Sequence, residues 1–313
     1  MSLPPAVARA VEEALGSPPV AAAAVGGGSI ASAARVLLAD GRTVFVKHDP
    51  GARPGAFGAE AAGLRWIAEA GALRTPEVLA LGDDEGDGGA PRFLALEWID
   101  RSASRSAQLN RGPSSNWATP APGEEFGRRL AALHRFGAPS FGLGADNAIG
   151  PIAQDNRPCG SWAEFYGHRR LVPLARRAAE AGRLTASALW GVEALAKRLP
   201  DLCGPAEPPA RLHGDLWSGN AILDARGGPV VVDPAVYGGH REMDLAMMRL
   251  FGGFPEAAHA AYREAHPLAD GHEDRVALCQ LYPLLVHVHL FGGGYAASVG
   301  AVLRRYSDRR LSR

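Results

Sequence analysis

The chain of 313 residues lacks most of the features that mark secreted, membrane-spanning or nucleic-acid-binding proteins. Its three cysteines, Cys159, Cys203 and Cys279, are widely spaced and form no metal-binding pair. This argues against a disulfide framework and predicts a reducing compartment, the cytosol. The 33 basic and 33 acidic residues give a formal net charge of zero, so no global attraction to nucleic acid is expected.

Long apolar runs are also missing. The longest, over residues 281–291, is interrupted by Pro283 and two histidines and is too short to span a bilayer. The first 16 residues carry two prolines and an acidic pair instead of a basic and then apolar leader. With 47% hydrophobic and 21% charged residues, we expect a globular monomer without membrane contact, with room for one large domain or two lobes.

Lysine is the scarcest cation, since only Lys47 and Lys197 occur. A lysine kept in an arginine-rich chain can serve for its compact ammonium group, which suits phosphate. Lys47 ends the strand-like run VFVK and matches the kinase lysine that meets nucleotide phosphates and pairs with a helix Glu. Glu60, early in the next predicted helix, is the natural partner. The structural alternatives are an edge-strand charge and an acid favoured by the helix dipole.

The hydrophobic periodicity divides the chain into two parts. The first part reads as a small sheet with one interposed helix, after an initial helix over residues 5–15. Its strands are expected over residues 20–25, 34–39, 43–47, 76–81 and 92–99, its helix over 57–70, and a hairpin turn at Asp40-Gly41. Residues 102–122 read as a loop or a partly disordered connector. Helices are then expected over residues 124–136, 162–181, 185–199, 242–250, 255–264, 275–291 and 295–306.

Two segments of the helical part carry the strongest functional pattern. Residues 213–220 read HGDLWSGN, and residues 230–235 read VVVDPA. An Asp followed five positions later by an Asn is typical of a kinase catalytic loop, in which the Asp accepts a hydroxyl proton and the Asn holds magnesium. Asp215 is therefore the predicted base, and Asn220 and Asp233 are the predicted Mg²⁺ ligands.

A surface turn is the alternative for these segments, since Gly, Asp, Ser and Asn are common turn formers. The flanking sequence favours the kinase, because two short strands around the pattern would bring Asp215, Asn220 and Asp233 to one end of a hairpin. His213 is expected to brace this loop by hydrogen bonds.

A glycine-rich segment, residues 26–31 (GGGSIA), is a candidate phosphate loop in which Gly27, Gly28 and Ser29 would meet ATP. The same residues fit a dinucleotide fingerprint with Asp49 as the ribose acid. An oxidoreductase is disfavoured because the Asp40-Gly41 turn comes too early for the crossover helix of a Rossmann unit.

Residues 93–99 (FLALEWI) match a kinase hinge in position, with Glu97, Trp98 and Ile99 offering backbone groups to adenine. A buried strand is the alternative. No GK[ST] phosphate loop is present, which excludes the other major class of ATP site. His287 and His289 are not expected to bind zinc, because positions i and i+2 point to different sides of a helix.

These segments resemble the fructosamine kinase (ketosamine-3-kinase) family, whose relatives include the aminoglycoside and choline kinases. The resemblance covers nearly the whole chain. It also rests on residues 154–156 (QDN), 233–237 (DPAVY), 239–246 (GHREMDLA), 250–254 (LFGGF) and 290–292 (LFG).

The resemblance implies an α+β, bilobal protein-kinase-like fold, with an N-lobe over residues 1–99, a C-lobe over 100–313, and ATP and Mg²⁺ in the cleft. It implies phosphorylation of the 3-hydroxyl of a ketoamine, the sugar adduct of a small amine or a protein lysine, and thereby deglycation. It carries Asp215 over as the base. Candidate substrate contacts are Trp217, Gln154, Asn156 and His287.

The chain departs from the family pattern in places. Ser29 stands where several relatives have a redox-sensitive cysteine, so that regulation is not expected, and Val286 and His289 flank His287 where Asn is common. Aminoglycoside or choline phosphorylation is the alternative activity, and a nucleotide-binding pseudokinase or scaffold is the alternative of another class. A protein kinase is disfavoured because the helix predicted soon after Asp233 leaves no room for an activation segment.

Overall fold

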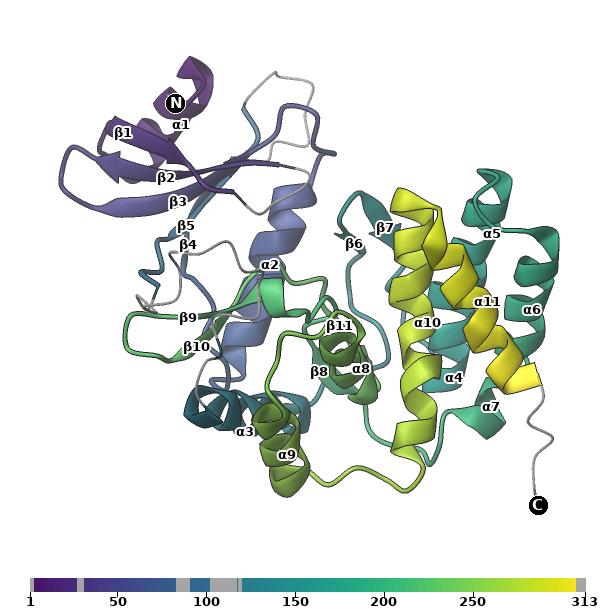
Figure 1. Ribbon diagram of the computed structural model, residues 1–313. Coiled ribbons are helices and arrows are strands. Elements are labelled where there is room, and N and C mark those ends of the chain that lie inside the picture. Colours follow the sequence, from purple (N-terminus) through teal and green to yellow (C-terminus); the bar gives the residue numbers. More distant parts are fainter. Residues whose placement is uncertain (1–2, 27–30, 83–90, 102–116, 118–119, 308–313) are drawn as a thin grey trace.

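The computed structural model of the chain is shown in Figure 1, and it describes residues 3–26, 31–82, 91–101, 117 and 120–307. An N-terminal antiparallel sheet lies beside a larger, mainly helical C-terminal part (Figure 1). The predicted α+β organisation, a small antiparallel sheet beside a larger helical part, is confirmed. β5 ends at Glu97, close to the lobe boundary expected at residues 99/100, which stays a prediction.

The N-terminal sheet has five strands in the order β1-β2-β3-β5-β4. They are β1 Pro19–Ala24, β2 Ser32–Leu38, β3 Thr43–His48, β4 Val78–Gly82 and β5 Phe93–Glu97. β2 and β3 pair from Ser32↔His48 to Leu37↔Thr43. Gly41 in their connection has a φ of 88°, a conformation that glycine adopts without strain. The predicted hairpin is confirmed.

Helices cover both faces of this sheet. α1 (Pro5–Leu15) packs its buried Val7 and Val11 against one face, which includes Val44 and Val46 of β3. α2 (Ala56–Glu69) packs against the opposite face, towards which Phe45 points. Because side chains alternate along a strand, Lys47 shares the α2 face with Phe45.

The C-terminal part consists of helices and three short strand pairs. The helices are α3 Pro120–Phe136, α4 Trp162–Phe165, α5 Val172–Glu180, α6 Ala186–Ala196, α7 Leu199–Leu202, α8 Glu242–Leu250, α9 Glu256–Ala265, α10 His272–Phe291 and α11 Gly294–Ser307. Two of the pairs are β8 (Ala210–Leu212) with β11 (Tyr237–Gly239), and β9 (Ala221–Leu223) with β10 (Pro229–Val231). The β9–β10 hairpin was expected from the sequence, and the strand at β11 was not.

Two expectations need correction, and one hairpin was not expected. The helix predicted over residues 162–181 is interrupted by a π-helical turn at Tyr166–Leu171, and Pro173 follows in the first turn of α5. The helix predicted from residue 124 begins at Pro120, because prolines are tolerated in the first turn of a helix. The hairpin β6 (Asn147–Ile149) with β7 (Ile152–Gln154) was not expected, because three-residue strands are too short to show a period of two.

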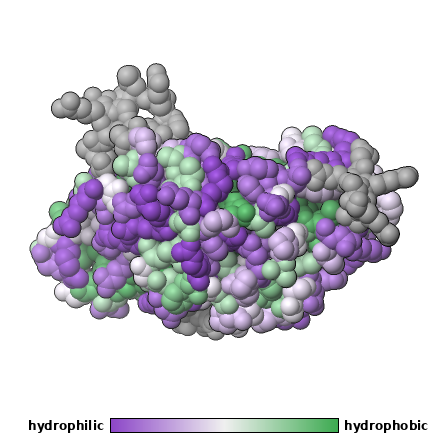
Figure 2. Space-filling view, turned by 90° about the horizontal axis from the view of Figure 1, so that it is seen from below, coloured by the Kyte–Doolittle hydropathy of each residue, from purple (hydrophilic) through white to green (hydrophobic). Residues whose placement is uncertain are grey.

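The described helices include none that is both long and apolar enough to cross a membrane. On the face shown in Figure 2, hydrophobic residues lie in small areas between hydrophilic ones.

Candidate active site

The site is built where the N-terminal sheet meets the β9–β10 hairpin. Lys47 Nζ lies 2.9 Å from Glu60 Oε1 of α2 and 2.5 Å from Asp233 Oδ1, which directly follows the valine run. The Lys47 side chain is only 15% exposed. Burial lowers the pKa of Lys47, but the two carboxylates outweigh burial and raise it. The ammonium is therefore a fixed positive charge between the two parts of the molecule.

Asp215, Asn220 and Asp233 also converge, as the sequence predicted. Asn220 Nδ2 donates to Asp215 Oδ2 over 3.1 Å and to the Asp215 carbonyl over 2.9 Å, and it lies 3.5 Å from the Asp233 carbonyl. Burial raises the pKa of Asp215 to about 7, and the nearby Asp233 charge adds to the rise. A bound divalent cation would oppose this rise, because its charge stabilises neighbouring carboxylates.

Asp244 of α8 fixes the backbone of the catalytic loop. Its carboxylate accepts the His213 N–H at 2.8 Å and the Gly214 N–H at 2.9 Å, and it lies 3.2 Å from His134 Nε2. Burial raises the pKa of Asp244, but the hydrogen bonds with His134 and with the Gly214 N–H help to outweigh burial and lower the pKa. The carboxylate therefore anchors the loop in its ionised form.

His213 braces the loop, in keeping with its expected role. Nε2 lies 3.0 Å from the Val232 carbonyl, which can only accept, and Nδ1 lies 3.3 Å from the Asp215 N–H. Burial lowers the pKa of His213, which agrees with this neutral tautomer. The imidazole thus connects the two segments that carry Asp215 and Asp233.

Two backbone positions in the loops have positive φ. Gly214 has a φ of 84°, and a Cβ there would overlap the Ala235 carbonyl. Asp233 has a φ of 53° and is the one non-glycine residue of the described part with positive φ. Backbone strain of this kind at a non-glycine residue is typical of functional sites.

The residues present fit a small hard cation. Asn220 and Asp233 offer amide and carboxylate oxygens, the donors that Mg²⁺ prefers together with phosphate oxygens and water. The Asp233 side chain is 44% exposed, so one face of the site is open to a ligand.

Of the predicted nucleotide residues, Gly27, Gly28 and Ser29 fall outside the described residues. Glu97 ends β5, where its carboxylate lies 2.5 Å from Arg74 Nη2 and its N–H donates to the Glu77 carbonyl. Trp98 Nε1 donates to Asp100 over 2.9 Å, and Ile99 is buried against the β9–β10 hairpin.

The candidate substrate residues occupy two kinds of position. The half-buried Trp217 packs over Gly219, where a Cβ would overlap its ring. Gln154 and Asn156 are buried: Gln154 Oε1 accepts from Tyr282 OH at 2.8 Å, and Asn156 Oδ1 from Arg170 Nη2 at 2.5 Å. The side chains of Gln154 and Asn156 are thus hydrogen-bonded within the protein. His287 lies in α10, five residues after Tyr282.

Sequence reasoning assigned no role to three residues that support the site. They are Asp244, Tyr282 and Arg170, whose Cζ lies 4.3 Å from the Tyr237 ring centroid. The available signal was the presence of acids in the otherwise largely apolar α8, because a buried carboxylate needs partners.

Comparison with known proteins identifies the family. The fructosamine kinase family model matches residues 4–309. A Synechocystis sp. protein named as probable ketoamine kinase is 37% identical over 86% of this chain and 84% of the relative. Protein-ribulosamine 3-kinase of Arabidopsis thaliana is 34% identical over 90% of this chain and 81% of the relative.

Solved structures agree with this assignment. A fructosamine-3-kinase homologue from Thermobifida fusca superposes with a TM-score of 0.83 at 42% identity, over 97% of this chain and 99% of the other. A choline/ethanolamine kinase family protein from Mesorhizobium loti shares the fold, with a TM-score of 0.59 at 16% identity over 91% and 90% of the chains. The chain belongs to the fructosamine kinase family and is a phosphotransferase.

Proposed function

We propose that this protein transfers the γ-phosphoryl group of ATP to the 3-hydroxyl of ketoamines. The resulting ketoamine 3-phosphate is unstable and later sheds its sugar, which frees the amine. The convergence of Lys47, Asp215, Asn220 and Asp233 is the observation that carries the proposal. A relative named as a ribulosamine 3-kinase supports the acceptor class.

The geometry gives each side chain a task. Asp215 would accept the proton of the acceptor hydroxyl. As the hydroxyl oxygen forms its bond to the γ-phosphorus, the bond between that phosphorus and the oxygen that leaves with ADP breaks. Lys47, held by Glu60, would neutralise phosphate charge, and the hydrogen bond from Asn220 orients the Asp215 carboxylate. When bound, Mg²⁺ would neutralise the nucleotide phosphates, with Asn220 and Asp233 as its protein ligands.

Nucleotide and acceptor are assigned to opposite sides of the site. Gly27, Gly28 and Ser29 would cover the phosphates, and the segment Glu97, Trp98 and Ile99 would border adenine. On the acceptor side we propose Trp217 as a flat face for the sugar and His287 as a polar contact.

Gln154 and Asn156 are buried and would support the acceptor side indirectly, by positioning the residues around it. Their hydrogen bonds to Tyr282 and Arg170 hold the segment after β7 in place. The three cysteines are free, which supports the cytosolic location, and a monomer is our proposal for the assembly.

The test is a panel of acceptors followed by ³¹P NMR. Fructosyl-lysine and ribulosyl-lysine are compared with kanamycin and choline at equal concentration. We expect a new phosphomonoester at the 3-position of the ketoamines. Phosphorylation of kanamycin or choline alone would replace the ketoamine assignment, and ATP binding without transfer to any acceptor would favour the pseudokinase.

A further inference from the structure

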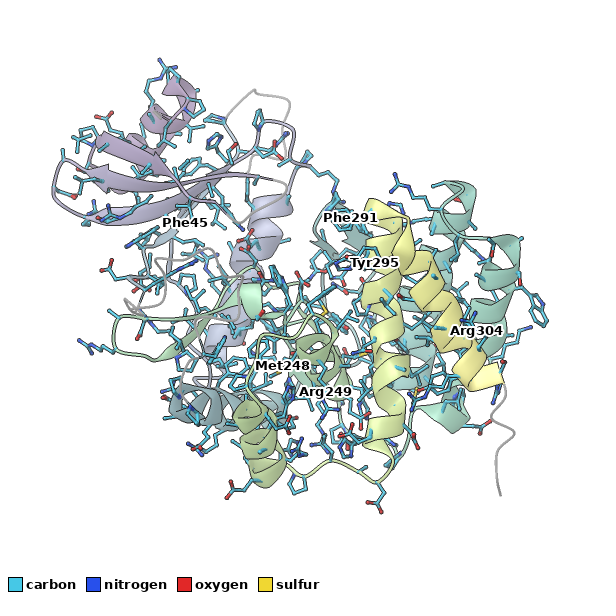
Figure 3. The ribbon with its side chains drawn as sticks, in the orientation of Figure 1. Phe45, Met248, Arg249, Phe291, Tyr295 and Arg304 are labelled. Carbon is cyan, nitrogen blue, oxygen red and sulfur yellow. The ribbon has the colours of Figure 1, made fainter. Side chains whose placement is uncertain are left out.

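Four ring side chains gather where α8 and α10 end and α11 begins. His287 lies at their centre, with ring centroid distances of 4.7 Å to Phe251, 4.9 Å to Tyr295 and 5.6 Å to Phe291. Figure 3 shows Phe291 and Tyr295 together at this end of α10. We call Phe251, His287, Phe291 and Tyr295 the aromatic wall.

Part of the aromatic wall is exposed and is not buried in the hydrophobic core. Phe291 is 62% exposed and Phe251 is 39% exposed, although both rings contact the half-buried imidazole. Leaving large apolar rings grouped at the surface is unfavourable unless something covers them. A bound ligand beside the active site would provide that cover.

Residues close in sequence to the aromatic wall contact the two segments that carry Asp215 and Asp233. Gly253, two residues after Phe251, has a φ of 93° and lies so close to Ser218 that a Cβ would overlap the Ser218 hydroxyl. On the other side, Tyr282 of α10 bonds to Gln154, whose Nε2 lies 3.3 Å from the Ala235 carbonyl next to the Asp233 segment. The aromatic wall therefore adjoins, along the chain, residues that contact the segments carrying Asp215 and Asp233.

The chemistry of the wall suits an alkylammonium group. His287 Nδ1 lies 2.8 Å from the Pro283 carbonyl, so Nδ1 carries the hydrogen and Nε2 presents a lone pair. Burial lowers the pKa of His287, which keeps the ring neutral. Three aromatic rings and a neutral acceptor attract a cation through ring faces and a hydrogen bond. None of the four carries a charge that would repel one.

A ketoamine carries such a cation close to its 3-hydroxyl group. Its amine nitrogen is separated from the 3-hydroxyl oxygen by only four bonds, and this secondary amine is protonated near neutral pH. With the hydroxyl at Asp215, the ammonium and the alkyl chain attached to it extend to the neighbouring surface. We propose that the aromatic wall binds this ammonium and its alkyl chain, and so selects ketoamines of lysine-like amines over neutral sugars. The inference rests on the proposed function.

The test compares a ketoamine with an ether analogue in which oxygen replaces the amine nitrogen. Each is made on a free lysine-like chain and within an acetylated peptide, so that the two sources of the same side chain are distinguished. The readout is the ratio of kcat/KM for amine over ether. We expect Phe291→Leu and Phe251→Leu to lower this ratio roughly fivefold to thirtyfold, the range of a desolvated cation–π contact, because leucine keeps apolar area without a ring face.

Trp190→Ala is the matched control, since this tryptophan of α6 is 72% exposed and lies outside the wall. It should leave the ratio unchanged. Binding of both compounds, measured by calorimetry without ATP, separates the two proposals. Amine-selective binding that Phe291→Leu abolishes, without any transfer, would contradict the proposed function alone. A ratio and an affinity that Phe291→Leu leaves at the wild-type value, or no binding of either compound, would overturn the aromatic wall.

Discussion

Lys47 and Asp233 are 186 positions apart in the chain, yet Lys47 Nζ lies 2.5 Å from Asp233 Oδ1. This ion pair joins the N-terminal sheet to the segment that we propose as a metal ligand. The Asp233 carboxylate is partly exposed, and the backbone of Asp233 has a strained φ of 53°. When the nucleotide binds, the Lys47 ammonium would also interact with phosphate, and the Asp233 carboxylate would also interact with magnesium.

Replacing Lys47 should therefore affect catalysis far more than replacing the other lysine. We expect Lys47→Met to lower kcat by about 10²–10³, the cost of removing one preorganised electrostatic contact. It also leaves Glu60 and Asp233 without their shared cation, so the melting temperature should fall. Lys197→Met is the matched control because Lys197 is exposed. Equal loss in both variants would contradict a special role for Lys47.

Asn220 is expected to govern the magnesium requirement. Asn220→Ala removes both a hard oxygen donor and the 3.1 Å hydrogen bond to Asp215. Half-saturation by Mg²⁺ should move to at least about tenfold higher concentration, as for lost metal-site partners, and kcat should fall with it. The measurement is a Mg²⁺ titration of the initial rate at saturating ketoamine. An unchanged titration curve would remove Asn220 from the metal site.

Asp244 should contribute to stability as well as activity. In the wild type, the two carboxylate oxygens of Asp244 accept hydrogen bonds from two backbone N–H groups. In Asp244→Asn, one of these oxygens is replaced by an NH₂ group, which cannot accept. Leaving a buried donor unpaired costs roughly 1–3 kcal/mol of unfolding free energy. Urea unfolding measures this, with Asp201→Asn at an exposed position of α7 as the control. A loss no larger than that of the control would show that the loop does not depend on this anchor.

Much of this arrangement follows from local sequence. The β2–β3 hairpin, the alternation that places Lys47 on the α2 face, and the spacing of Asp215 and Asn220 are short-range patterns. The Lys47–Glu60 contact that the sequence predicted is present in the structure.

What the sequence does not show depends on long-range packing. Asp244 reaches His213 from 31 positions away, and Tyr282 reaches Gln154 from 128. No periodicity encodes such contacts. The π-helical turn at Tyr166–Leu171 is hidden for a different reason, because its hydrophobic spacing looks like that of an ordinary helix.

A buried histidine far from the site should make the fold sensitive to acid. Burial, reinforced by Arg249, lowers the pKa of His259 to about 4 from its ordinary 6.5. Between pH 6.5 and 4 the unfolded chain binds this proton and the folded one does not, so the unfolding free energy falls as the pH falls. The whole effect amounts to roughly 3 kcal/mol.

Substitution of this residue should flatten that dependence. Urea unfolding between pH 7 and 4 is compared for wild type, His259→Gln and the control His168→Gln, whose side chain is exposed. The His259 variant should lose less stability on acidification than the wild type. The same slope in all three proteins would show that His259 does not cause the effect.

The central claim is that Asp215 accepts the proton of a ketoamine hydroxyl. Its most direct test is the initial rate of ketoamine 3-phosphate formation by Asp215→Asn, followed by ³¹P NMR beside Asp201→Asn. The account predicts a rate about 10²–10⁴ lower for Asp215→Asn, the usual contribution of a general base, with ATP binding and the melting temperature close to wild type. A rate within a few-fold of the wild type in that variant would contradict it.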